Sequence, residues 1–212
     1  MSGINVYRVP LGSYECNCYL VHNTADNNTI IIDCGDGKEL VNYIEKNNLN
    51  LNIKYGLLTH GHFDHTMGVE YIQRHFNTTF FMSLPDLQSQ YDEPYLFTKL
   101  YNINPVYDNL ILNFDSFEVE VIATPGHTLG SVSYRIDDLL FTGDTLFKGT
   151  IGRTDLYGGD FNTIIESIRF KLFSLPDDTI VYPGHGEESS IGEEKINNRF
   201  LRDILGDENL DG

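Results

Sequence analysis

Short aliphatic runs separated by turn residues make up much of the chain. Such runs, rich in β-branched side chains and bounded by Gly, Asn and Asp, are typical of β-strands. The first part of the chain is therefore predicted to be strand-rich, and further strands are predicted after its middle. The predicted strands cover residues 4–9, 18–21, 30–32, 54–59, 110–112, 117–123, 132–136, 139–142 and 179–182.

Apolar residues spaced three and four apart predict helices between these strands. One helix begins after the cap residue Asp36, with Glu39 three residues later as in a capping box. Another helix begins just past residue 65, and a third begins after the cap residue Asp160 and ends before Pro176. A charged helical tail after the last predicted strand extends to residue 205. The inward positions are residues 40, 41 and 44, then 69, 72 and 76, then 161, 164, 165, 168 and 172.

Residues 83–107, here called the aromatic segment, follow neither period. Pro85, Pro94 and Pro105 interrupt it, and five aromatic residues are scattered through it. Three roles are open for this segment: covering a substrate, forming a dimer contact, or packing on the surface without a specific role. The order of elements around it predicts an α/β fold in which two mixed sheets pack together with helices outside.

The length and charge of the chain limit the number of domains and the kinds of partner that it can have. A chain of 212 residues suits a single domain, residues 1–212, with a substantial core. Its formal charge of -17 disfavours nucleic acid and anionic membranes as partners. No apolar run is long enough to cross a bilayer, and the first ten residues lack an export signal. We therefore expect a cytoplasmic protein, either a monomer or a homodimer.

The three cysteines are expected to be reduced thiols. Cys16, Cys18 and Cys34 are an odd number in a chain of this size, which argues against a disulfide framework. We interpret them as small apolar side chains in strands. A metal site built on Cys16 and Cys18 has no evident partners in the sequence.

Five of the seven histidines follow predicted strands, next to Gly or Asp. His60 and His62 are two apart in extended chain, so both side chains can point to one side and share an ion. Asp64 and His65 lie past the turn and can hold a second ion. Imidazole and carboxylate are ligands that suit zinc, iron or manganese.

Three downstream segments repeat this arrangement. Each has a strand-like run, then a glycine, then one potential ligand. The glycine-ligand pairs are Gly126-His127, Gly143-Asp144 and Gly184-His185. Together they supply three further ligands for a site with two metals.

The four motifs in this order resemble the ligand signature of the metallo-β-lactamase superfamily. They are His-x-His-x-Asp-His at 60–65, Pro-Gly-His-Thr at 125–128, Gly-Asp-Thr at 143–145 and Gly-His-Gly at 184–186, and the similarity runs from about residue 17 to 200. The resemblance implies a four-layer αββα sandwich. It also implies one metal on His60, His62 and His127, a second on Asp64, His65 and His185, and Asp144 bridging both.

Within that superfamily the chain is similar to the short glyoxalase II-like hydrolases. The bridging position is Asp144 rather than a cysteine, and Gly-Asp-Thr-Leu-Phe at 143–147 and Gly-Gly-Asp at 158–160 fit that branch. Two features depart from the pattern: Asn-Arg-Phe at 198–200 replaces the usual Asn-Pro-Phe, and only 27 residues follow His185. A separate C-terminal helical domain that binds glutathione is therefore not expected.

The resemblance implies a hydrolase for small thioesters such as S-lactoylglutathione. In this hypothesis the cofactors are two divalent metal ions. Zinc is the expected metal, and iron or manganese are the alternatives. A metal-bridging hydroxide attacks the thioester, with Asp64 and Asp144 as catalytic residues. The alternative is a persulfide dioxygenase of the same superfamily, which uses one iron held by His60 or His62, His127 and Asp144.

Two further residues have weaker assignments. Asp33 resembles a superfamily position that braces a ligand histidine, although a plain turn carboxylate is equally open. Arg153 corresponds to a basic residue that faces glutathione in longer relatives. An ion pair with Asp155 or Asp160 explains Arg153 equally well.

Overall fold

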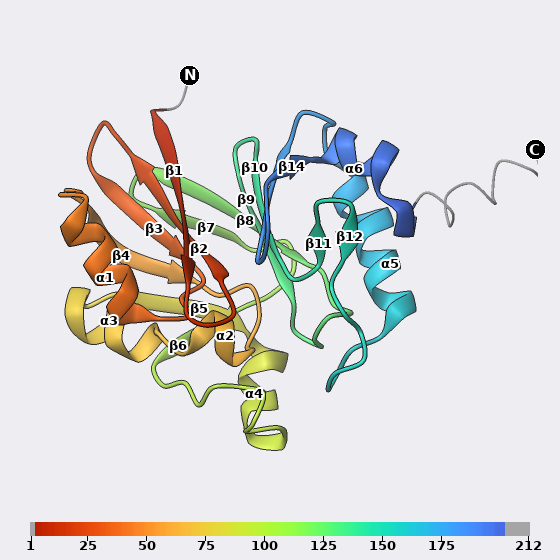
Figure 1. Ribbon diagram of the computed structural model, residues 1–212, viewed down its shortest axis with the longest axis horizontal. Coiled ribbons are helices and arrows are strands. Elements are labelled where there is room, and N and C mark those ends of the chain that lie inside the picture. The colour runs from red at the N-terminus through yellow and green to blue at the C-terminus, as the bar shows by residue number, and fades with distance from the viewer. Residues whose placement is uncertain (1–2, 202–212) are drawn as a thin grey trace, which may run out of the picture.

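Two six-stranded sheets face each other in the computed structural model, which describes residues 3–201 (Figure 1). The first has the order β1-β2-β3-β4-β5-β6. Its first three strands are antiparallel neighbours, and β3 to β6 run parallel because helices connect them. The strands are Ile4–Leu11, Cys16–Asn23, Asn28–Ile32, Asn52–Leu57, Thr79–Ser83 and Ile103–Val106, and the connecting helices are α1 Gly37–Lys46, α2 Phe63–Thr66, α3 Val69–Phe76 and α4 Leu84–Asp92.

The second sheet has the order β14-β13-β10-β9-β8-β7. Only β10 and β13 are parallel in it, and helix α5 lies between them in the chain. A small ribbon of β11 and β12 stands beside this sheet (Figure 1). The elements are β7 Ile111–Phe114, β8 Phe117–Ala123, β9 Val132–Ile136, β10 Leu139–Gly143, β11 Leu146–Phe147, β12 Thr150–Ile151, α5 Phe161–Phe170, a 3-10 turn Leu172–Ser174, β13 Ile180–Pro183, β14 Ser189–Ser190 and α6 Ile191–Asn197.

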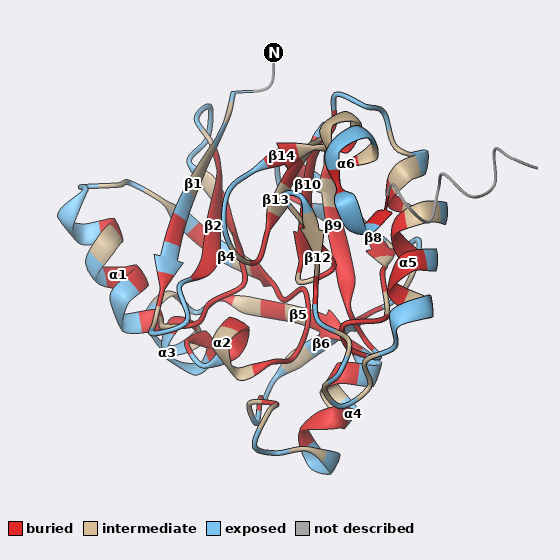
Figure 2. Cartoon of the chain, turned by 45° about the vertical axis from the view of Figure 1, so that its right-hand side comes forward, coloured by how far each residue is buried: buried red, intermediate tan, exposed pale blue. Residues whose placement is uncertain are grey.

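Three apolar clusters divide the molecule into four layers. On β2, Leu20 packs toward α1 and α3, whereas Tyr19 and Val21 pack between the two sheets, as the alternation of side chains in a strand requires. On β10, Leu140 faces α5 and Phe141 faces the first sheet. Figure 2 shows the buried strands at the centre and the exposed helix faces outside. The predicted αββα sandwich is confirmed.

The two predicted helix caps are confirmed, but the predicted capping box and one predicted core position are wrong. The Asp36 side chain accepts hydrogen bonds from the backbone of residues 38 and 39, and the Asp160 side chain accepts one from Thr163 N. The Glu39 side chain does not close a capping box, because it accepts from Gly12 N instead. Phe161, predicted to point inward, is 46% exposed and was wrongly assigned to the core.

The aromatic segment contains regular structure that its pattern does not predict. Helix α4 buries Asp86, Ser89 and Gln90, so it has a polar buried face instead of an apolar stripe. Strand β6 includes Pro105. The proline is tolerated there because β6 lies at the edge of its sheet.

The last part of the described chain is helical, as predicted. Helix α6 ends at Asn197, and Asn198 donates from its side chain to Thr150 O, which attaches the end of α6 to β12. Residues 202–205 of the predicted tail lie outside the described residues. No helix within residues 3–201 is both long and apolar enough to span a membrane.

Candidate metal centre

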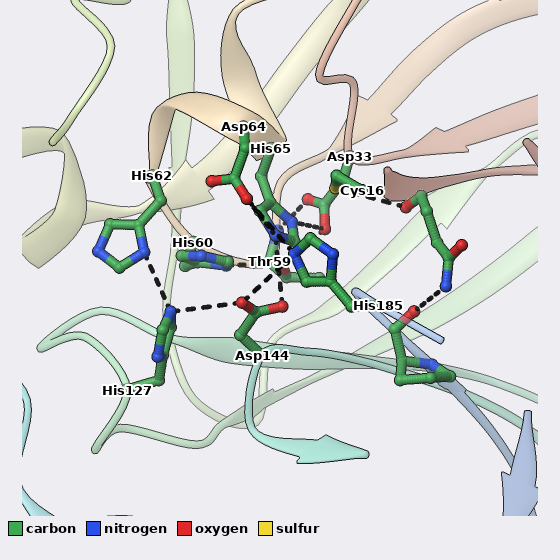
Figure 3. A network of polar contacts seen from close by, with 12 residues as sticks. Cys16, Asp33, Thr59, His60, His62, Asp64, His65, His127, Asp144 and His185 are labelled. Atoms are coloured by element: carbon green, nitrogen blue, oxygen red, sulfur yellow. Dashed lines mark hydrogen bonds and ion pairs between the residues drawn. The ribbon is translucent and has the colours of Figure 1, made fainter. Parts of the chain in front are cut away.

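All seven predicted ligands lie together in one group (Figure 3), and most of them come just after a strand of one of the two sheets. A ligand that directly follows a strand is carried by a rigid element, so its position is fixed by the fold. His60 and His62 follow β4, Asp64 and His65 are in α2, His127 is between β8 and β9, Asp144 directly follows β10, and His185 follows β13.

The first group of donors consists of three histidines. One ring nitrogen from each of His60, His62 and His127 lies within 4.8 Å of the others, and all three side chains are buried. His127 Nε2 lies 3.0 Å from His62 Nδ1. The three predicted ligands of one metal are therefore together.

The second group lies beside the first and is more open. His185 Nε2 is 3.3 Å from Asp64 Oδ2, and His65 Nε2 is 3.9 Å from the same oxygen. The His185 side chain is 31% exposed and that of Asp64 16%, whereas His65 is fully buried. Solvent and small molecules therefore reach the centre from the side of His185.

Asp144 stands between the two groups. Its Oδ1 lies 3.3 Å from His65 Nε2, and its Oδ2 lies 3.6 Å from His127 Nε2 and 3.7 Å from His185 Nε2. One carboxylate thus reaches donors of both groups, which is the geometry that a bridging ligand needs.

Buried donor atoms without partners test whether metal ions fit here. Within residues 3–201, Nε2 of His60, His62 and His65 and Oδ1 of Asp144 are buried and accept or donate no hydrogen bond. Such atoms are rare in folded proteins, because each costs about 1–3 kcal/mol when unpaired. Imidazole nitrogen and carboxylate oxygen are zinc and iron ligands, so the donor set fits divalent cations.

Hydrogen bonds fix the orientation of the imidazole rings. Asp33 Oδ2 lies 2.8 Å from His65 Nδ1, and Asp33 also accepts from Thr59 N and Thr59 Oγ1 at 2.8 Å and 2.7 Å. His127 Nδ1 lies 2.7 Å from the carbonyl oxygen of Arg153. Each bond favours a proton on Nδ1 and leaves Nε2 free as a ligand. The contact predicted for Asp33 is therefore present.

Charges differ between the two groups of donors. Burial lowers the pKa of His60 far below its ordinary value and lowers the pKa of His62 to about 3, so both rings are neutral. Burial lowers the pKa of His65 and His185, but the neighbouring acidic groups outweigh it and hold both pKa values above the ordinary one, so metal binding at the second group displaces protons. Burial alone would raise the pKa of Asp144, but the neighbouring His65 and His127 hold it below its usual range. Neutral imidazole and ionised carboxylate are the forms that bind metal.

Two glycines allow the strand ends to meet. A Cβ on Gly184 would lie 2.2 Å from Asp144 Oδ1 and 2.7 Å from His65 Cε1. Gly143, just before Asp144, has a φ of +50° and its Cβ would lie 2.3 Å from Thr59 Oγ1. Glycine at these two positions therefore lets the backbone approach the neighbouring donors closely.

The Arg153 side chain pairs with a neighbouring carboxylate. Its Nε and Nη2 donate to the two oxygens of Asp155 at 2.7 Å and 2.8 Å. This is one of the ion pairs that the sequence left open. Its contribution to the centre is the backbone carbonyl that holds His127.

Asp86 was not predicted from the sequence as a residue of this site. It is fully buried; its Oδ2 accepts from Gly61 N and Thr128 Oγ1, and its Oδ1 accepts from Gly130 N. Burial raises the pKa of Asp86, an effect that these three donors oppose. Asp86 thereby joins the loop of His60 and His62 to the loop of His127. Its position in the aromatic segment, next to Pro85, offers no sequence signal for that role.

A sandwich of two sheets with a buried His/Asp cluster at the strand ends defines a class of metal-binding proteins. The chain belongs to the Metallo-beta-lactamase superfamily, whose family model matches residues 11–185. The family resemblance in the sequence is thus confirmed.

Three similar proteins cover nearly the whole chain. Hydroxyacylglutathione hydrolase GloC of Haemophilus influenzae is 37% identical over 210 residues, which span 93% of this chain and 98% of that protein. The crystal structure of BLEG-1, a B3 metallo-beta-lactamase, is 34% identical with a TM-score of 0.82 and covers 93% of this chain and 99% of its own. TTHA1623 in a di-iron-bound form is 29% identical with a TM-score of 0.76 and covers 92% of this chain and 100% of its own.

Proposed function

We propose that this chain is a binuclear metal-dependent hydrolase of small thioesters of the S-acyl glutathione type. The observation that carries the proposal is Asp144, which lies between the two groups of donors. Its Oδ1, like Nε2 of His60, His62 and His65, is buried without a hydrogen-bond partner within residues 3–201. The similarity to a hydroxyacylglutathione hydrolase along almost the full length of both proteins supports the thioester as substrate.

Seven side chains would hold two divalent cations. Zinc is the proposed metal, with iron or manganese as alternatives. His60, His62 and His127 would hold one, Asp64, His65 and His185 the other, and Asp144 both. When bound, such ions lower the pKa of water from 15.7 towards about 7 and polarise a carbonyl oxygen. The di-iron form of TTHA1623 supports a centre with two metals.

The side chains have separate tasks in this reaction. Asp33 and the carbonyl of Arg153 hold His65 and His127 with Nε2 directed into the centre. Asp64 faces the open side next to His185, where it would orient the attacking water. A thioester releases a thiolate, which needs little protonation, so a separate general acid is not required.

The open side of the centre continues into a pocket of about 290 Å³. His185, Asn17, Tyr14 and Arg8 are among the residues that line it. Arg8 Nη1 donates to Gly186 O at 2.7 Å, which holds the guanidinium beside the loop of His185. The Arg8 guanidinium is a positive charge in a chain whose formal charge is -17. It is therefore suited to bind a carboxylate of the glutathione part of the substrate.

The proposal includes a cytosolic setting and a free small-molecule substrate. All three cysteines are unpaired and buried, which suits a reducing compartment. The acidic surface disfavours nucleic acid as a partner.

One preparation tests the proposed function. Metal identity and stoichiometry would be measured on the full chain, together with S-lactoylglutathione hydrolysis, oxygen uptake with glutathione persulfide, and cleavage of a β-lactam. Two metals per chain with thioesterase turnover are expected. One iron with oxygen consumption would instead support the dioxygenase, and β-lactam cleavage alone would support a lactamase like BLEG-1.

The bridging role of Asp144 has its own test. Asp144→Ala is expected to lose metal and thioesterase activity together, because both donor groups lose their shared carboxylate. Asp137→Asn, at an exposed turn position, serves as the control for loss of one negative charge. An Asp144→Ala variant with full metal content and unchanged turnover would refute the role.

A further inference from the structure

The thiol of Cys16 lies beside the second group of donors and has no task in the proposed reaction. Its Sγ lies within 4.8 Å of one ring nitrogen of His65 and one of His185. Figure 3 shows Cys16 beside Asp33, on the flank of the cluster that includes His65 and His185. The sequence interpretation of Cys16 as a small apolar side chain does not account for this position.

Hydrogen bonds from the adjacent residue hold this thiol in place. Asn17 N donates to Gly184 O at 2.7 Å, and Asn17 Nδ2 donates to Pro183 O and Gly186 O, both at 3.0 Å. These bonds join the start of β2 to the loop that carries His185. The distance between the thiol and the His185 ring is therefore set by backbone contacts on both sides.

His65 is held in place independently of Asn17. Its Nδ1 is held by Asp33 at 2.8 Å, and its backbone oxygen accepts from Cys34 N at 2.7 Å. His65 is fully buried, and its Nε2 has no hydrogen-bond partner within residues 3–201. One ring nitrogen of this buried histidine lies within 4.8 Å of the thiol sulfur.

The surroundings of Cys16 differ from those of Cys18. Cys18, two residues further along β2, packs in the apolar cluster with Leu20 and Cys34. Cys16 is equally buried but lies outside that cluster, and its Sγ makes a long contact of 3.9 Å with Asn17 O and a polar contact with the His65 side chain. Cys18 therefore provides a matched control for Cys16.

We infer that the Cys16 thiolate is an additional ligand at the second metal position, alongside His65 and His185. On binding, the sulfur-metal bond replaces the S–H bond, and the proton passes to solvent. A soft sulfur ligand makes this position prefer cobalt, zinc, cadmium or iron over manganese. The inference rests on the proposed metal centre but not on the thioester specificity.

Cobalt provides a spectroscopic test that does not depend on activity. The metal-free full chain would be loaded with Co²⁺, the bound cobalt counted per chain, and the near-ultraviolet spectrum recorded. A sulfur-to-cobalt charge-transfer band is expected in the wild type. It is expected to be lost in Cys16→Ser and kept in Cys18→Ala/Cys34→Ala, in which Cys16 is the only cysteine left.

Each result decides the inference. Two bound cobalt ions without the band in the wild type, or a band that survives in Cys16→Ser, would overturn it. If Cys16→Ser does not fold, the Cys18→Ala/Cys34→Ala protein still decides, because only Cys16 can then give the band. Failure to bind cobalt at all would overturn the metal centre itself. The band together with absent thioesterase activity would overturn only the proposed substrate.

Discussion

The substitution Asp33→Asn tests whether hydrogen bonding sets the tautomer of a ligand histidine. Asp33 has a φ of +57°, a conformation that Asn also adopts, so the backbone turn is expected to persist. Two of the three donors to Asp33 meet Oδ2: Thr59 Oγ1 at 2.7 Å and His65 Nδ1 at 2.8 Å. The third, Thr59 N, meets Oδ1 at 2.8 Å.

The amide that Asp33→Asn introduces can fit in only one favourable way. Its NH₂ cannot replace Oδ1, because Thr59 N is an obligatory donor there. It must replace Oδ2, where the Thr59 hydroxyl can rotate to accept but His65 Nδ1 must lose its proton. The proton then moves to His65 Nε2, the atom that lies 3.3 Å from Asp144 Oδ1 and would bind the second metal.

The expected loss follows from this change of tautomer. Replacing an outer hydrogen-bond partner of a metal ligand costs about 10–100-fold in metal affinity, or about 1.4–2.7 kcal/mol. The larger loss is expected at the second metal position, because Asp33 contacts His65 directly. Asp33 reaches His60 of the first group through Thr59 Oγ1, which lies 3.1 Å from His60 Nδ1.

Calorimetric titration of the metal-free chain with zinc measures both positions separately. Asp33→Asn is expected to weaken one zinc-binding step by about 10–100-fold and the other step by less. Asp137→Asn, the same replacement at an exposed position with a φ of +53°, is the control. Thermal unfolding in the presence of chelator shows whether the fold is retained. Two unchanged zinc affinities in Asp33→Asn would refute the reasoning.

Three further variants test other parts of the centre. Gly184→Ala places a Cβ 2.2 Å from Asp144 Oδ1, so we expect loss of bound metal with an unchanged circular dichroism spectrum; full metal content would contradict the crowding. Asp86→Asn sets an amide against a backbone donor in either orientation, so urea denaturation should show about 1–3 kcal/mol lower stability. Arg8→Gln should raise KM for S-lactoylglutathione about tenfold with little change in kcat, and an unchanged KM would remove Arg8 from substrate binding.

The metal donors could be predicted from the sequence because their signals are local. His60, His62, Asp64 and His65 lie within six residues of one another, and each of the other three ligands is preceded by a glycine at the end of a strand-like run. Strand ends bring such residues to one edge whatever the detailed packing. The short β-branched runs and the order of the elements likewise predicted two mixed sheets with helices outside.

Other parts of the site depend on contacts between distant segments. Asp86 reaches Gly61 and Gly130, which are 25 and 44 residues away in the chain. The helix that carries Asp86 buries polar side chains that hydrogen-bond to loops, so no apolar period marks it. Cys16 lies near His185 because Asn17 hydrogen-bonds to Pro183 and Gly184, at the end of β13 and just after it. Sequence spacing contains no information about these contacts.

A zinc titration of the metal-free chain, followed by S-lactoylglutathione hydrolysis at each addition, tests the central claim most directly. A binuclear centre predicts that two zinc ions bind per chain and that hydrolysis reaches its maximum only with the second. Full activity with one zinc ion, or no hydrolysis with two bound, would contradict a binuclear thioester hydrolase.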